Sequence, residues 1–177
     1  ALLEPERRAI EKRPTENLAA YEDYLRGKNY INSVDLSGAE LNVQLLQRAV
    51  SADPQFAEAW ASLSVAYHTL YWAFDRPGTL TLETEAAKRA QERAPDLPET
   101  HRALGGVAYA HREFDKAFTY FETAQRLLPN GDAAQDVGFA LSRLGRWQEA
   151  LDQFEDERRL TPRDFAIYAD GLGITKM

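Results

Sequence analysis

Three histidines are the side chains best suited to acid–base or metal chemistry in this 177-residue chain. A neutral imidazole binds metal ions and exchanges protons near neutral pH. His101 and His111 are ten positions apart, which puts them on roughly the same side of one helix but nearly three turns apart. They cannot share a metal ion without a third ligand from elsewhere. We therefore interpret them and His68 as packed or exposed helix residues, and we predict no metal site.

The other residues that could carry catalysis are also better explained by structural roles. Asp152, Glu155 and Asp156 lie together on one helix face, which is typical of a solvated surface rather than an acid–base pair. Gly105-Gly106 lacks the preceding strand and the spacing of a phosphate-binding loop. The chain has no cysteine, which excludes disulfides, thiolate metal sites and cysteine nucleophiles. We predict no catalytic residue, no cofactor and no enzymatic activity.

The composition argues against some classes of partner and against a membrane-spanning segment. The net charge of −7 argues against binding to a nucleic-acid backbone, which requires a basic face. No apolar run approaches the length of a membrane span. Charged residues between positions 4 and 8 interrupt anything like a signal peptide, and the first residue is Ala1, so we expect a fragment or a processed chain. Location stays open between the cytoplasm, which is preferred, and the periplasm.

The stretch between Pro95 and Pro129, which are 34 residues apart, contains two helix-length apolar patterns separated by a short polar break. Apolar residues recur at the spacing of one helix face in each half. Gly105 lies inside the first pattern, where glycine costs roughly 1 kcal/mol relative to alanine, so its presence needs a packing reason. We predict two antiparallel helices that approach closely at Gly105, with Phe121 filling the space opposite as a core anchor.

This pattern resembles the tetratricopeptide repeat family. Counted from Pro98, the family's preferred residue types occur at its eighth, twentieth, twenty-fourth, twenty-seventh and thirty-second positions: Gly105, Ala117, Phe121, Ala124 and Pro129. The resemblance implies an all-α fold, a right-handed αα-superhelix of about four helix pairs. The expected organisation is a charged N-terminal helix and linker, then a solenoid over 16–177 that divides into repeats at about 16–54, 55–95, 96–129 and 130–162 and a partial fifth unit at 163–177.

Four local features of the array carry specific expectations. The second repeat carries seven extra residues, which we place in an aromatic insertion from Tyr71 to Gly78 that ends in a Pro-Gly turn signal. In the fourth repeat Gly145 is expected to stop the first helix in the left-handed conformation. Glu157 replaces the family's usual alanine, so we expect it to point outward and that end to pack less tightly. Residues 165–172 are expected to form either a cap or an exposed edge.

In this family the first helix of each pair lines the concave face, so the resemblance implies a partner-binding surface there. The implied residues are Tyr24, Lys28, Glu58, His68, Glu99, Arg102, Tyr109, Gln135, Phe139 and Arg143, with Trp72 and Phe74 as a secondary candidate. The lysines and asparagines that hold a terminal carboxylate in chaperone-binding members are absent, so we predict no such activity. The aromatic residues with Arg102 and Arg143 suit a segment with an apolar residue and an acidic neighbour. Alternatively, Tyr109 and Phe139 only pack between repeats, and Trp72 and Phe74 only cover the insertion's own core.

The function implied by the resemblance is protein–protein interaction, with a protein or peptide as the partner. The sequences of residues 13–27 and 97–105, together with the aromatic insertion around Trp72, look similar to repeat regions of bacterial multidomain signalling proteins. In those proteins the repeats follow a cyclase, a protein kinase or a winged-helix regulator. The chain would then be the interaction or regulatory part of such a protein. Two alternatives stay open: a self-association module that forms a homodimer through its C-terminal edge, and the regulatory tail of an enzyme without catalysis of its own.

Overall fold

The computed structural model describes residues 14–31, 33 and 35–160. The predictions for the N-terminal charged helix and for the partial fifth unit fall largely outside the described residues. Within them all the regular secondary structure is helical, with no strand. The helices are α2 (Leu18–Lys28), α3 (Leu36–Ala52), α4 (Ala57–Phe74), α5 (Thr79–Arg93), α6 (Pro98–Ala110), α7 (Phe114–Leu127), α8 (Gly131–Arg143) and α9 (Trp147–Leu160).

The helices begin and end where the sequence provides the appropriate groups. Asn17, Asp35 and Asn130 precede α2, α3 and α8, and the side chain of each accepts a hydrogen bond from an amide in the first turn of its helix. Gly145 follows α8 with φ of +75°, as predicted, so the chain can turn directly into α9. Short connections of this kind make consecutive helices antiparallel neighbours, and the pairs are α2–α3, α4–α5, α6–α7 and α8–α9.

Within a pair, a glycine on the first helix lets an aromatic ring from the second approach its backbone. A Cβ atom built on Gly105 would lie 2.4 Å from Cε1 of Phe121, and one built on Gly138 would lie 2.7 Å from Cε1 of Phe154. Phe121 is only 5% exposed. The predicted close approach of α6 and α7 at Gly105, with Phe121 as a core anchor, is therefore confirmed.

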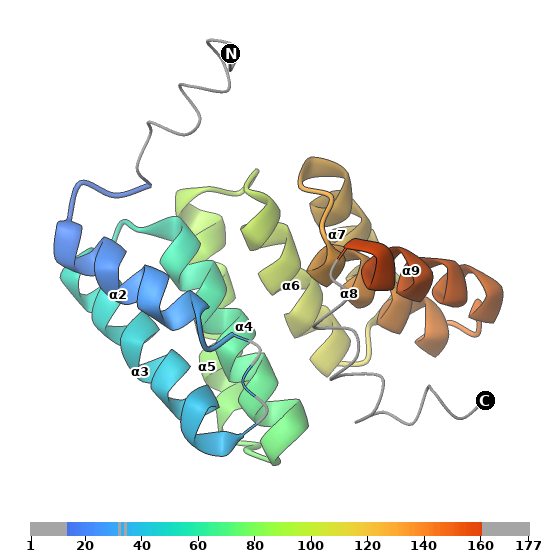
Figure 1. The fold of residues 1–177 in the computed structure, drawn as a ribbon, viewed down its shortest axis with the longest axis horizontal. Coiled ribbons are helices and arrows are strands. Elements are labelled where there is room, and N and C mark those ends of the chain that lie inside the picture. The colour runs from blue at the N-terminus through green and yellow to red at the C-terminus, as the bar shows by residue number, and fades with distance from the viewer. Residues whose placement is uncertain (1–13, 32, 34, 161–177) are drawn as a thin grey trace, which may run out of the picture.

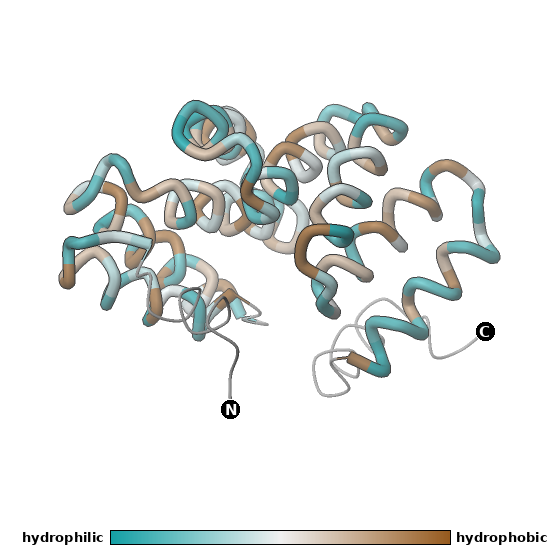
Figure 2. Tube along the Cα trace, turned by 90° about the horizontal axis from the view of Figure 1, so that it is seen from above, coloured by the Kyte–Doolittle hydropathy of each residue, from teal (hydrophilic) through white to brown (hydrophobic). Residues whose placement is uncertain are grey.

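The helix pairs stack side by side (Figure 1), and seen from above they follow an arch (Figure 2). One core cluster extends through α2, α3, α4 and α5, and a second extends through α6, α7, α8 and α9. Between them lies a smaller cluster whose fully buried members are all alanines: Ala61, Ala87, Ala90 and Ala103. We call this cluster the alanine seam, because it joins the two halves of the arch.

The prediction that Glu157 points outward is wrong. Its side chain is 3% exposed, and Oε1 accepts a hydrogen bond of 2.8 Å from Nε2 of Gln135 on α8. A buried carboxylate is tolerated when it is hydrogen-bonded, so the amide from the neighbouring helix replaces the solvent that we expected Glu157 to need. The end of the fourth pair is packed here rather than open.

The aromatic insertion lengthens a helix instead of forming only a loop. Tyr71 to Phe74 are the last turn of α4, which ends at Asp75 in the left-handed conformation with φ of 50°. Phe74 packs against the first core cluster, whereas Trp72 is 45% exposed. None of the described helices is both long and apolar enough to cross a membrane.

Candidate functional site

The first helices of successive pairs meet around a hollow of about 110 Å³, which we call the inner hollow. Its apolar lining includes Ala61 and Val65 from α4 and Ala133 from α8. Lys28 from α2 and Glu99 from α6 contribute charged groups to the same lining. The hollow therefore combines small apolar side chains with ionisable ones that come from different helix pairs.

Tyr24 is buried and is not part of the lining of the inner hollow. Its ring is buried and packs against Phe56 at 4.8 Å between ring centroids. Burial raises the pKa of the Tyr24 hydroxyl to about 12; Glu99 and Glu58 raise it further by charge repulsion, while a hydrogen bond with Ser62 opposes them. The negative charges of α4 and α6 thus both act at the Tyr24 hydroxyl.

Arg102 lines the hollow but is held by two carboxylates of α8. Its Nη1 donates to Oδ2 of Asp132 at 3.0 Å, and its Nε donates to Oδ2 of Asp136 at 2.5 Å. Burial by itself would lower the pKa of the guanidinium, but the charges of Asp136 and Asp132 raise it above its ordinary value. The side chain is 22% exposed, so these ion pairs are partly shielded from water. Arg102 links α6 to α8.

Arg143 and Tyr109 make a second link between the same two helices. Nε of Arg143 donates a hydrogen bond of 2.8 Å to the Tyr109 hydroxyl, and the guanidinium lies 5.8 Å from the centre of the Tyr109 ring. Tyr109 is buried, and it also contacts His68 and Trp72 of α4, at 6.3 Å and 5.6 Å between ring centroids. This position supports the alternative in which Tyr109 packs between repeats.

His68 forms a pair with a carboxylate that the sequence analysis did not single out. Its Nδ1 lies 2.8 Å from Oε1 of Glu83, whose side chain is fully buried. A Cβ on Gly106 would approach Oε1 of Glu83 to 3.3 Å, so the glycine leaves room for the pair. The burial of Glu83 could have been predicted from the sequence, because Glu83 lies on the same face of its helix as Ala87 and Ala90.

Gln135 and Phe139 face α9 rather than the inner hollow. Gln135 is buried and donates to Glu157, and the Phe139 ring lies 5.4 Å from that of Phe154. Of the residues predicted to bind a partner, the lining of the hollow brings together Lys28, Glu99 and Arg102. The other predicted residues are not part of that lining.

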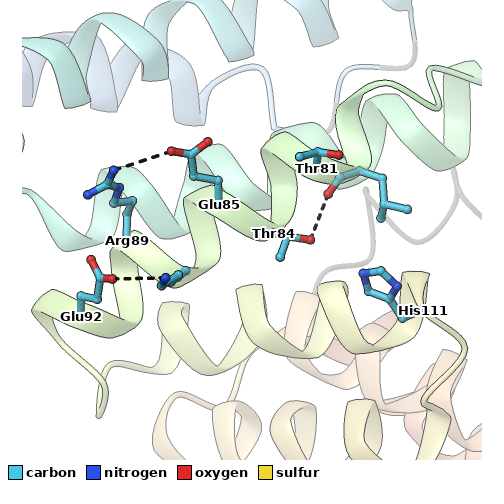
Figure 3. A pocket seen from close by; sticks show the side chains of 8 residues that line it. Thr81, Thr84, Glu85, Arg89, Glu92 and His111 are labelled. Atoms are coloured by element: carbon cyan, nitrogen blue, oxygen red, sulfur yellow. Dashed lines mark hydrogen bonds and ion pairs between the residues drawn. The ribbon is translucent and has the colours of Figure 1, made fainter.

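A larger hollow, of about 580 Å³, lies along the exposed side of α5 and reaches His111 at the end of α6 (Figure 3). The charges drawn there pair within α5: Arg89 lies 3.7 Å from Glu85, and Lys88 lies 4.0 Å from Glu92. Such exposed pairs of opposite charge cancel locally, so this surface has no net charge to select a partner. Within the described part of the chain, no group of three or more His, Cys, Asp or Glu residues could hold a metal ion.

Neither a protein-family model nor a curated protein sequence matches this chain. Among solved structures, it is similar to TTC0263, a thermophilic TPR protein of Thermus thermophilus, with a TM-score of 0.67 and 22% identity over 97% of this chain and 87% of that one. PilF of Pseudomonas aeruginosa gives a TM-score of 0.58 and 18% identity over 86% and 68% of the two chains. A structure of MamA gives 0.50 and 17% over 77% and 80%. These likenesses show the fold, which is the predicted superhelix of tetratricopeptide helix pairs.

Proposed function

We propose that this chain is a protein-interaction module that holds an extended segment of a partner protein in the inner hollow. The observation that carries the proposal is the lining itself, in which the half-buried Val65 and the exposed Leu128 present apolar surface next to Lys28 and Glu99. Stacked helix pairs create concave surfaces of this kind, and small apolar side chains at their floor leave space for a partner's side chain. The predicted solenoid over 16–177 and its repeat divisions are part of this proposal.

The test is a selection of random peptides on the full chain, followed by measurement of their affinity for two variants. Val65→Arg places a long charged side chain in the lining of the inner hollow. Thr84→Arg adds the same side chain to the separate hollow along α5. We expect Val65→Arg to weaken the selected peptides about tenfold or more and Thr84→Arg to leave their affinity unchanged. Peptides that bind both variants as well as the unmodified chain would refute the proposal.

Self-association is the second candidate, and exposed apolar side chains on α9 favour it. Trp147 is 66% exposed, and Leu151, one turn further along, is also exposed. A terminal unit of a solenoid has one face without a neighbouring repeat, so a second copy of the chain could cover it. Light scattering on the chain and on Trp147→Ser distinguishes the cases. A dimer that persists in the variant would exclude this face as the interface.

We also propose, from the sequence resemblance of residues 13–27 and 97–105, that the module belongs to a larger bacterial signalling protein, as its interaction or regulatory part. The coding sequence upstream of Ala1 tests this directly. A cyclase, protein kinase or winged-helix domain there would support the proposal, whereas a start codon immediately upstream of Ala1 would contradict it.

A further inference from the structure

Arg143 differs from Arg102, although both link α6 to α8. Arg102 is bound to two carboxylates, those of Asp132 and Asp136. Arg143 is exposed and is held by a neutral group, because its Nε donates to the Tyr109 hydroxyl and its guanidinium lies 5.8 Å from the centre of the Tyr109 ring. Within the described part of the chain, no carboxylate forms an ion pair with Arg143, and its Nη groups donate no hydrogen bond. Tyr109 therefore orients the guanidinium but leaves its charge and its outer donors available.

Trp72 adds an exposed ring beside the same tyrosine. It is 45% exposed, although its ring lies 5.6 Å from that of Tyr109 and 5.3 Å from that of Tyr71, between centroids. The buried Tyr109 of α6 thus supports two exposed side chains from the neighbouring helices, Trp72 of α4 and Arg143 of α8. We call these three residues the Arg143 patch. Tryptophan, tyrosine and arginine are the residue types that dominate the binding energy of protein interfaces.

The carboxylates of the surrounding helices do not neutralise Arg143. Glu83 on α5 is hydrogen-bonded with a histidine, and Asp136 on α8 is bound to an arginine. Asp75, which follows the last turn of α4, makes no ion pair with Arg143. Arg112, two residues after the end of α6, is a further cation, and no described carboxylate pairs with it. The counter-charge for Arg143 must therefore come from solvent or from a partner.

The charge of the whole chain limits how acidic that partner can be. A run of acidic residues would be repelled by the net charge of −7, whereas a single carboxylate avoids most of this repulsion. A carboxylate also matches the forked donors of a guanidinium and can bind them through both oxygens. On an extended segment, the side chain two positions away lies about 7 Å further along on the same side. Both exposed groups of the patch lie within 5.8 Å of the centre of the Tyr109 ring, so one extended segment can reach both.

We propose that the Arg143 patch docks an extended segment of a partner protein, in which one aspartate or glutamate binds Arg143 and a large apolar side chain two positions away packs on Trp72. This surface is separate from the inner hollow, because none of its three residues belongs to that lining. Trp72 lies seven positions after Val65, two turns further along the same face of α4. The inference therefore adds a second surface and does not depend on the proposed function.

The first test divides the peptides selected on the full chain by the variant that weakens them. Arg143→Gln removes the charge of the patch, and Arg89→Gln removes the same charge from the exposed side of α5. We expect a group of peptides that Arg143→Gln weakens about tenfold or more and that Arg89→Gln leaves unchanged, with an acidic residue two positions from a large apolar one. The absence of such a group, or a group without the acidic residue, would overturn the inference. Peptides weakened by Val65→Arg alone would support only the proposed function, and peptides weakened by Arg143→Gln alone would support only this inference.

The second test uses one peptide of this group in two synthetic forms, with the acidic residue kept or replaced by its amide, and fluorescence anisotropy as the readout. We expect the unmodified chain to bind the acidic form about tenfold more tightly, the difference to shrink in high salt, and Arg143→Gln to bind both forms equally. Trp72→Ala should weaken both forms but keep the preference, because it removes only the apolar contact. Circular dichroism checks that each variant keeps its helicity. A preference that persists in Arg143→Gln would place the acidic residue on another cation and would overturn the inference.

Discussion

Replacing Gly105 with alanine should destabilise the chain, although alanine is the better helix former. The new methyl group would lie 2.4 Å from Cε1 and 2.5 Å from Cδ1 of Phe121, distances at which the ring or one helix must move. The ring has little room to move, because Phe121 is almost fully buried and packs among Ala117 and other residues of the second core cluster. The sign of the change in the free energy of unfolding then depends on two opposing effects.

The gain in helix propensity from glycine to alanine is about 1 kcal/mol. Adding a methyl group to a well-packed core costs about 1–3 kcal/mol, and contacts with two ring atoms place Gly105→Ala at the upper end of that range. We therefore expect a net loss of about 1–2 kcal/mol. Phe121→Ala alone should cost about 3–5 kcal/mol. In the double variant the methyl group introduced at position 105 occupies part of the space left by the ring, so the combined loss should be smaller than the sum of the single losses by about 1–2 kcal/mol.

Urea unfolding, followed by circular dichroism, measures these differences in the free energy of unfolding. Gly78→Ala is the control, since no atom lies within 4 Å of a Cβ built on Gly78. Its stability should stay within about 0.5 kcal/mol of the unmodified chain. If Gly105→Ala is more stable than the unmodified chain by about 1 kcal/mol, as expected for an exposed helix position, the argument from close approach is refuted.

Three further outcomes follow from the polar groups. Glu157→Ala should cost about 1–3 kcal/mol in urea unfolding, because it removes the acceptor of the buried Gln135 amide; a change below about 0.5 kcal/mol would contradict this. Arg102→Ala should cost about 1–3 kcal/mol by the same measurement, because two carboxylates lose their cation. The control Arg89→Ala breaks only an exposed ion pair and should change the free energy of unfolding by less than about 0.5 kcal/mol. Equal losses in the two variants would show that the link between α6 and α8 is not stabilising. The pKa of Tyr24 is raised from 10.0 to about 12, so the unfolded chain loses this proton at lower pH than the folded chain. Stability should therefore fall as pH rises from 10 to 12, by about 3 kcal/mol more than in Tyr24→Phe; identical pH profiles for the two chains would refute the shift.

The helix pairs and their closest contacts could be predicted from the sequence because they depend on local pattern. Apolar spacing defines each helix, and a glycine inside such a pattern, such as Gly105, indicates a close neighbour. The left-handed position of Gly145 follows from the same kind of reasoning, since the turn between α8 and α9 is short. These features need no knowledge of how distant pairs meet.

The partners of the charged side chains could not be predicted in this way. Arg102 was expected to face a ligand, but the side chains that hold it come from the next helix pair, at 30 and 34 positions along the chain. Whether a long side chain meets a neighbour or solvent depends on the angle between pairs, which local pattern does not determine. Glu157 illustrates the same limit, because its burial depends on the amide of Gln135. The binding roles of the inner-hollow residues stay predictions.

The alanine seam has a mechanical consequence. Alanine side chains have no rotamers to interlock, so Ala61, Ala87, Ala90 and Ala103 contribute a smooth part of the contact between the two halves of the arch, beside the larger Trp60, Leu104 and Val107. Small sliding of packed helices is one of the ways in which proteins change shape, and a smooth contact opposes it least. The lining of the inner hollow draws on both sides of this seam, with Ala61 and Val65 on α4 and Glu99 on α6. A segment held there would bridge the two halves of the arch, and the distance between α2 and α9 would then report whether the hollow is occupied.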